Sequence, residues 1–217
     1  MNKITNHEIA TTLIRAKEHL NEGDSNPKAN YICIALEHVC VPRYMIYYIQ
    51  DNIIMKRLGK SSTMTKFLLE QGISSEELTK VRVQRHRHAW LDMLIEEFTK
   101  KAQEDNKRRA IAKVFRDAIE LLWDGESNLH TEQFVYICHA IKKSSTIYPG
   151  QYKRLLTQSK IDALAIITDR LGVHYSLEAW LGEQGFVGSE SEYQTHRINW
   201  LRLLVKEFIP EEILCYN

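Results

Sequence analysis

Two stretches of fifteen residues decide the fold: residues 84–98 read QRHRHAWLDMLIEEF, and residues 194–208 read QTHRINWLRLLVKEF. Aligned without gaps they share eight identities, far more than unrelated segments share by chance. In each stretch the apolar residues recur every three or four positions, for example Trp90, Leu94 and Phe98, which predicts an amphipathic helix. The match between them indicates that one helical module occurs twice in the chain.

Three further blocks recur in the same order, which extends the repeat over most of the sequence. Their offsets are 105, then 113 in two blocks, and the final helices are 110 apart, so the length changes fall between blocks, as loop insertions do. We therefore expect a first copy over residues 1–105 and a second over residues 106–217. The matched blocks are Tyr31–Leu36 with Tyr136–Ile141, Arg57–Gly59 with Arg170–Gly172, and Thr63–Gly72 with Ser176–Gly185.

Each copy is predicted to hold about five helices and no sheet, which makes the fold class all-α. Glycines follow most of the apolar-periodic segments, as expected at helix C-termini, and period-two alternation is missing. The charged segment Lys100–Arg116, which has no Gly or Pro, should be largely helical and join the copies. The helices expected before the final one are 8–20 and 112–123, ending at Gly23 and Gly125; the two Tyr-Ile-Cys segments; 43–58 and 151–171, ending at Gly59 and Gly172; and the short helices that start at Thr63 and Ser176 and end at Gly72 and Gly185.

The composition is that of a globular chain with a proper core, with 44% hydrophobic and 26% charged residues. A net charge of +1 gives no general attraction to nucleic acid or to anionic membranes. The sequence shows neither a signal peptide nor an apolar run of the roughly 20 residues that span a bilayer. Four cysteines without a CxxC pair fit a reducing compartment, so we expect a soluble cytoplasmic protein whose Cys33 and Cys138 pack in its core.

The paired histidines His86 and His196 precede Trp90 and Trp200 by one helical turn. We expect each ring to pack against its tryptophan. A metal would need convergent ligands, and His86 and His88 point to different sides of a helix. We therefore predict no metal site and no cofactor.

The paired arginines Arg87 and Arg197 have two interpretations. Each guanidinium could clamp an acid of the short helix, Glu70 or Glu183, through two hydrogen bonds. Alternatively, the two arginines could line a cleft that binds an anionic ligand.

The first copy is basic at Lys80–His88, with Arg82, Arg85, Arg87 and His88, where the second copy is acidic at 190–198. This asymmetry is typical of a solvated helix face, of different surroundings for the two copies, or of head-to-tail contact between molecules in a homo-oligomer. A second basic run occurs at Lys107–Arg109.

The tyrosines Tyr44, Tyr47 and Tyr48 could stack nucleic-acid bases, but their helical spacing favours the core or a subunit contact. The sequence carries no glycine-rich phosphate loop, no HExxH and no GxSxG. Catalysis is therefore less expected than binding, although a helical hydrolase stays open.

The pattern Tyr-Ile-Cys-x-Ala-Leu at Tyr31–Leu36, with Arg-x-x-Trp-Leu-x-x-Leu-Ile/Val from Arg87 and from Arg197, resembles small uncharacterised proteins encoded by tailed bacteriophages. The first copy departs from it with Phe67, where the second has Trp180. The resemblance implies a phage accessory protein in the host bacterial cytoplasm that inhibits a host protein or sequesters a small anionic ligand in counter-defence, without a membrane partner. The candidate binding residues are Arg82, Arg85, His86, Arg87, His88, His196 and Arg197. The alternative is nucleic-acid binding through Lys80–His88 and Lys107–Arg109.

Overall fold

The computed structural model describes residues 2–21, 32–59, 64–124, 137–143, 156–172, 177–210 and 213–215. The chain divides into two compact units, Met1–Glu104 with Glu211–Asn217, and Asp105–Pro210. Helices dominate both units, which confirms the all-α fold class. The predicted boundaries, 1–105 and 106–217, differ from this division mainly in residues 211–217, which group with the first unit. The predictions on Gly23, Tyr31, Thr63, Gly125, Tyr136 and Ser176 lie outside the described residues.

The first unit begins with strand β1 (Asn2–Ile4) and helix α1 (Asn6–Asn21), followed by the short helix α2 (Ile32–Glu37). The predicted helix 43–58 is continuous but not uniform. It consists of α3 (Arg43–Tyr48), a π-helical stretch (Ile49–Met55) and α4 (Lys56–Leu58), and it stops at Gly59, whose φ of 62° suits glycine. Helix α5 (Met64–Glu70) and a 3₁₀ turn (Ser75–Glu77) lead into α6 (Lys80–Asp124).

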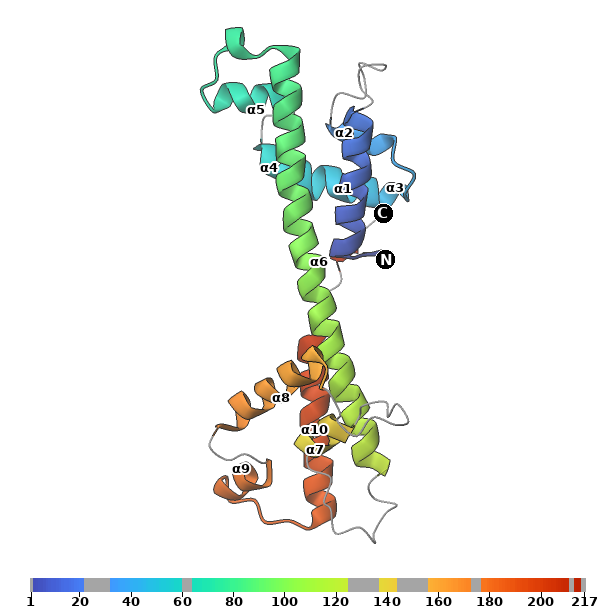
Figure 1. Cartoon of the computed structure of the whole chain (residues 1–217), viewed down its shortest axis with the longest axis vertical. Helices are drawn as coiled ribbons and strands as arrows, with labels where there is room; N and C mark the ends of the chain where they lie inside the picture. The colour runs from blue at the N-terminus through green and yellow to red at the C-terminus, as the bar shows by residue number, and fades with distance from the viewer. Residues whose placement is uncertain are drawn as a thin grey trace. The chain divides into compact units, whose positions relative to one another are not determined.

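Helix α6 has 45 residues and contributes to both units (Figure 1). It covers the final helix predicted for a first copy, the joining segment and the opening helix predicted for a second, so the helical prediction for Lys100–Arg116 is confirmed. The second unit continues with α7 (Ile137–Lys143), α8 (Gln158–Leu171), α9 (Leu177–Glu183) and α10 (Glu190–Phe208). Helix α8 begins at Gln158, because Thr157 before it has an extended ψ of 157°. The predicted start at Gln151 lies outside the described residues.

Each unit has its own core, built on the predicted apolar stripes. In the first unit Leu91 and Leu94 of α6 are 0% and 1% exposed and pack with the buried face of α1. In the second, Leu201 of α10 is 0% exposed and packs with Phe115 of α6. Trp90 and Trp200 are half-buried at the edges of these cores. No described helix is long and apolar enough to cross a membrane.

Several interactions recur at matching positions in the two units. Arg57 pairs with Glu97 through two hydrogen bonds of 2.7 and 2.9 Å, and Arg170 pairs with Glu207. The amide of Gln84 donates to the Leu20 carbonyl oxygen at the end of α1, and the amide of Gln194 donates to the Leu122 carbonyl oxygen near the end of α6. The same side chains thus join the same kinds of element twice.

The offset between the matched sequence positions changes where the structure has an additional turn. The short helices are followed by Gly72 and Gly185, both with positive φ (85° and 80°) and 113 positions apart. The residues before the final helices, Thr79 and Ser189, are 110 positions apart. The difference of three equals the length of the 3₁₀ turn Ser75–Glu77, which lies between Gly72 and Thr79. The second unit passes directly from Gly185 to the capping box of Ser189 and Glu192.

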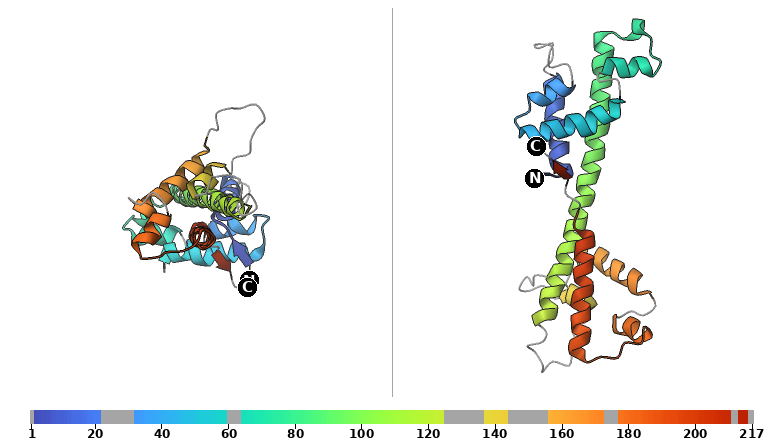
Figure 2. Two further views of the ribbon diagram at one scale, coloured as in Figure 1. Left: turned by 90° about the horizontal axis from the view of Figure 1, so that it is seen from below. Right: turned by 180° about the vertical axis from the view of Figure 1, so that it is seen from behind.

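One antiparallel strand pair, which we did not predict, is present in the first unit. Strand β2 (Ile213–Cys215) pairs with β1 in the register Asn2 with Cys215 and Ile4 with Ile213. Strands of three residues are too short to show alternation, so the sequence carries no signal for them. The two strands lie side by side near the N-terminal end of α1 in both orientations (Figures 1 and 2). Strand β2 also contacts α3.

Candidate ligand-binding site

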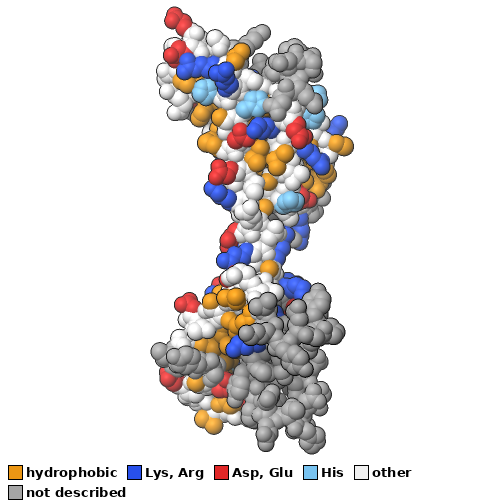
Figure 3. Space-filling view, in the orientation of Figure 1, with side chains coloured by type: hydrophobic (Ala, Val, Ile, Leu, Met, Phe, Trp, Pro, Cys, Tyr) orange, Lys and Arg blue, Asp and Glu red, His pale blue; other side chains and the backbone are white. Residues whose placement is uncertain are grey.

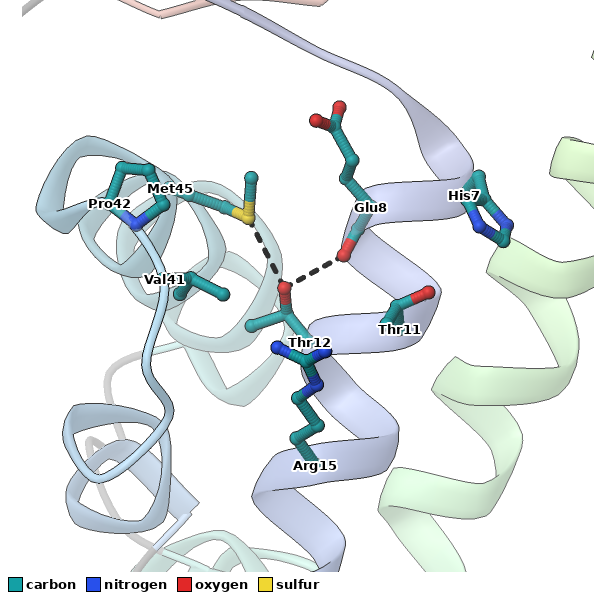
Figure 4. Close-up of a pocket in the computed structure, with 8 residues that line it drawn as sticks. All are labelled: His7, Glu8, Thr11, Thr12, Arg15, Val41, Pro42 and Met45. Carbon is teal, nitrogen blue, oxygen red and sulfur yellow. Dashed lines mark hydrogen bonds between the residues drawn. The ribbon is translucent and has the colours of Figure 1, made fainter.

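A pocket of about 280 Å³ lies in the first unit between α1 and the start of α3 (Figure 4). One wall is a polar face of α1, and the other is apolar and comes from the chain that enters α3. The lining residues are His7, Glu8, Thr11, Thr12 and Arg15 on the first wall and Val41, Pro42 and Met45 on the second.

The polar wall follows from the local sequence of α1. Thr5 caps the helix. The Glu8 backbone N–H donates to Thr5 Oγ1 at 3.2 Å, and the Thr5 backbone N–H and hydroxyl both donate to Glu8 Oε2 at 2.8 Å. Ile9, Leu13 and Leu20 are buried and fix which face of the helix meets the core. The positions 7, 11 and 15, each one turn apart, then fall together on a different face.

The apolar wall is held against α1 by a buried threonine. Pro42 precedes α3, and its carbonyl oxygen accepts from the Met45 backbone N–H at 3.0 Å. The hydroxyl of Thr12, which is 1% exposed, lies 2.8 Å from the Glu8 carbonyl oxygen and 3.2 Å from the Met45 sulfur. A hydroxyl has one proton, so these two contacts occupy the donor of Thr12. Thr12 therefore has no hydroxyl proton left to donate to a ligand.

Three polar side chains of the pocket remain available. Within the described part of the chain, His7, Thr11 and Arg15 make neither a hydrogen bond nor an ion pair through their side chains. Arg15 is exposed and reaches back along α1 toward Thr12, across from Val41 and Met45 (Figure 4). Its guanidinium stays charged at any physiological pH and can hold a carboxylate or phosphate with two hydrogen bonds.

The basic segment Lys80–His88, our first candidate, does not form one surface. Arg87 is 7% exposed and donates to Gln84 Oε1 at 3.0 Å, whereas Arg85 is exposed. Arg82 lies 3.7 Å from Glu77. His86 is half-buried and so is His88, whose pKa is lowered first by burial and then by Lys17.

Arg197 is the most enclosed cation of the described chain. It is 1% exposed, its Nε donates to Glu178, and its Nη1 donates to Glu190 at 2.5 Å and to Gln194 Oε1 at 2.8 Å. We had predicted Glu183 as the clamping acid, but these bonds involve Glu178, at the other end of α9, and Glu190. With two carboxylates on a buried guanidinium, Arg197 is a structural clamp and not an open anion site.

The other predicted binding residues, His196 and Lys107–Arg109, lie on different helices, α10 and α6. His196 is exposed, and its ring lies edge to face with Phe186, with 4.7 Å between the ring centroids. The neighbour expected from the sequence is Trp200. Lys107 is exposed and lies 3.5 Å from Asp162, Arg108 donates to the Glu207 carbonyl oxygen at 2.7 Å, and Arg109 is exposed. On the face seen in Figure 3, Lys and Arg side chains are interspersed with acidic ones.

The tyrosines and cysteines for which the sequence favours a packing role lie mostly against the cores. Tyr44 and Tyr48 pack against the first core, while Tyr47 is 57% exposed. Cys33 and Cys138 are free thiols packed against the two cores, and burial raises the pKa of both.

Arg15, Thr11 and His7 are not among the binding residues predicted from the sequence, although they follow one another at four-residue spacing on a capped helix. What it could not supply was the second wall. The described residues contain no group of three or more His, Cys, Asp or Glu side chains placed to hold a metal ion. Comparison with known proteins finds no matching family model, no similar curated protein and no similar solved structure.

Proposed function

We propose that this protein is a non-catalytic phage accessory protein that captures a small anionic ligand in the pocket between α1 and α3. Its place of action is then the host bacterial cytoplasm, where sequestering such a ligand would counter a host defence. This proposal keeps the ligand class expected from the sequence and moves the site from the paired arginines to Arg15.

The observation that carries the proposal is the state of Arg15. Several arginines of the described chain are held by acids: Arg57 and Arg170 by acids of the final helices, and Arg197 by Glu178 and Glu190. Arg85 and Arg109 are exposed like Arg15, but neither lines the pocket. Arg15, by contrast, is an exposed cation in the lining of a concave pocket with an apolar wall. Few, well-placed polar groups in an otherwise apolar concavity are typical of small-molecule sites.

A matched pair of variants tests this site. Arg15→Gln and Arg85→Gln remove the same charge from exposed positions of the first unit, and Arg85 belongs to the basic segment of the sequence prediction. Binding of small organic anions, followed by ¹⁵N chemical shifts of the full chain, should weaken at least tenfold in Arg15→Gln and stay within twofold in Arg85→Gln. Equal losses in both variants, or a loss confined to Arg85→Gln, would refute the pocket.

Nucleic-acid binding is the weaker candidate, because several of its cations are already paired or buried: Arg82, Arg87, Lys107 and Arg108. A phosphate-tracking surface loses affinity steeply as salt rises. Retention on DNA or RNA that falls in this way, and that drops on Arg85→Gln, would favour it over ligand capture.

We also propose that the two units are divergent copies of one module. The recurring Arg–Glu pairs, the two Gln-to-carbonyl bonds and the matched glycine stops support this origin. The pocket does not follow the repeat, since its α1 residues have no match among the recurring sequence blocks. Ligand capture is therefore proposed as a property of the first unit alone.

A further inference from the structure

We infer that the pocket between α1 and α3 selects a carboxylate carried on a short apolar stem over a phosphate ester or another dianion. This inference rests on the proposed function and names its ligand class. It follows from the charge count of the lining, from the geometry of the available donors and from the opposite wall.

The charge of the lining balances to zero. Arg15 contributes one positive charge, Glu8 contributes one negative charge, and the remaining side chains of the lining are neutral when His7 is neutral. One negative charge on a ligand can be matched by Arg15. A second has no counter-charge in the lining and faces Glu8.

The Glu8 side chain cannot rotate away from the pocket without breaking the helix cap. Its Oε2 accepts from both the backbone N–H and the hydroxyl of Thr5, so the carboxylate is held at the first turn of α1. Seven residues separate Glu8 from Arg15, a rise of about 10 Å along the helix. For a ligand charge placed at that distance from the Glu8 carboxylate, the repulsion lowers affinity between about twofold, at the dielectric constant of water, and about fifteenfold, at an effective value near 20.

The donors suit a single planar anion. A guanidinium presents a flat fork that matches the two oxygens of a carboxylate. The Thr11 hydroxyl lies one turn nearer the start of α1, within the same lining, and adds a neutral donor or acceptor. No second cation of the described lining is present to share the charge of a phosphate.

The second wall accounts for the stem. Val41, Pro42 and Met45 face the polar face of α1 across the pocket (Figure 4). Each methylene that leaves water against such a wall improves affinity by about fourfold. A volume of about 280 Å³ is near the lower end for ligand pockets, which limits the stem to a few carbon atoms.

The test compares four probes at pH 8 on the full chain: 4-methylpentanoate, acetate, isobutyl phosphate and the neutral 4-methylpentanamide. We expect 4-methylpentanoate to bind at least tenfold more tightly than acetate, and more tightly than isobutyl phosphate or the amide. Isobutyl phosphate is dianionic at this pH, because the second pKa of a phosphate ester is about 6. Arg15→Gln should abolish the preference for 4-methylpentanoate over its amide.

Glu8→Gln is the decisive variant. Glutamine can also complete the helix cap, so the fold is retained, and far-UV circular dichroism checks this. Removing the charge relieves the repulsion once for a monoanion and twice for a dianion. The affinity ratio of isobutyl phosphate to 4-methylpentanoate should therefore rise by about twofold to fifteenfold.

The outcomes separate the two proposals. Arg15-dependent binding with isobutyl phosphate preferred in the wild-type chain, or an unchanged ratio in Glu8→Gln, overturns the ligand class and leaves the proposed function standing. Binding of no probe in an Arg15-dependent way overturns the proposed function and the ligand class together.

Discussion

Replacing Arg197 by alanine should destabilise the second unit far more than replacing Arg170. Arg197 is 1% exposed and holds Glu178 and Glu190, whose side chains are 22% and 47% exposed. Removing one partner of a fully buried ion pair costs about 3 to 5 kcal/mol. Because water can reach both acids, we discount this figure to about 2 to 3 kcal/mol, including the cavity left by the side chain.

The control is Arg170→Ala, which breaks an ion pair of the same unit whose side chains are 41% and 48% exposed. An exposed pair of this kind contributes about 0 to 1 kcal/mol. Hydrogen exchange of the buried α10 amides reads the stability of this region separately from the first unit. A loss of 2 kcal/mol accelerates exchange about thirtyfold, since 1.4 kcal/mol is about tenfold.

Two results would refute the structural role assigned to the buried Arg197. Exchange in Arg197→Ala within about twofold of wild type would mean that the buried clamp contributes little. Equal acceleration in Arg170→Ala would mean that burial does not distinguish the two arginines. Glu178→Gln, which keeps an acceptor and removes a charge, should fall between wild type and Arg197→Ala.

Three further predictions concern acid, the terminal strand and the glycines. The pKa of Glu97 is lowered to about 2, first by its hydrogen bond to Arg57, so the stability it contributes is present above about pH 4.5 and is lost as the pH falls through 2; Arg57→Ala should cost under about 1 kcal/mol in urea unfolding at pH 7 and only a small fraction of that at pH 2, where Glu97 is half protonated. Deleting residues 211–217 removes β2, which touches both β1 and α3, so Arg15-dependent ligand binding should weaken several-fold while α10 exchange stays unchanged. Gly172→Ala, at a φ of 58°, should lower stability by about 1 to 2 kcal/mol, whereas Gly182→Ala, inside α9 with open space at its Cβ, should raise it by about 0.5 to 1 kcal/mol, both by urea unfolding.

Much of the helical architecture could be predicted because its determinants are local. The spacing of Trp90, Leu94 and Phe98 identifies one face of α6, and the stops at Gly59 and Gly172 rest on a backbone conformation that glycine favours. Periodicity also reveals which face of a helix is buried. It does not reveal which other helix covers that face.

The site could not be predicted for that reason. The partner acids of Arg197 come from α9 and from the first turn of α10, and several acids near it in sequence fit a clamp equally well. The pocket depends on Met45 meeting Thr12, two residues 33 positions apart whose types carry no mutual signal. Lys80–His88 carries a cluster of basic residues that the sequence makes visible, whereas Arg15 is a single basic residue at its place in α1.

The pairing of β1 with β2 also imposes an order on translation and folding. During synthesis on the ribosome, Asn2–Ile4 emerges first, but its partner Ile213–Cys215 is translated only after the whole of Asp105–Pro210. Contacts between such distant segments close late, because the loop entropy must be overcome before they form. The first unit therefore cannot complete its strand pair until residues 105–210 have been translated. A pause of translation within this segment would leave the edge of β1 unpaired.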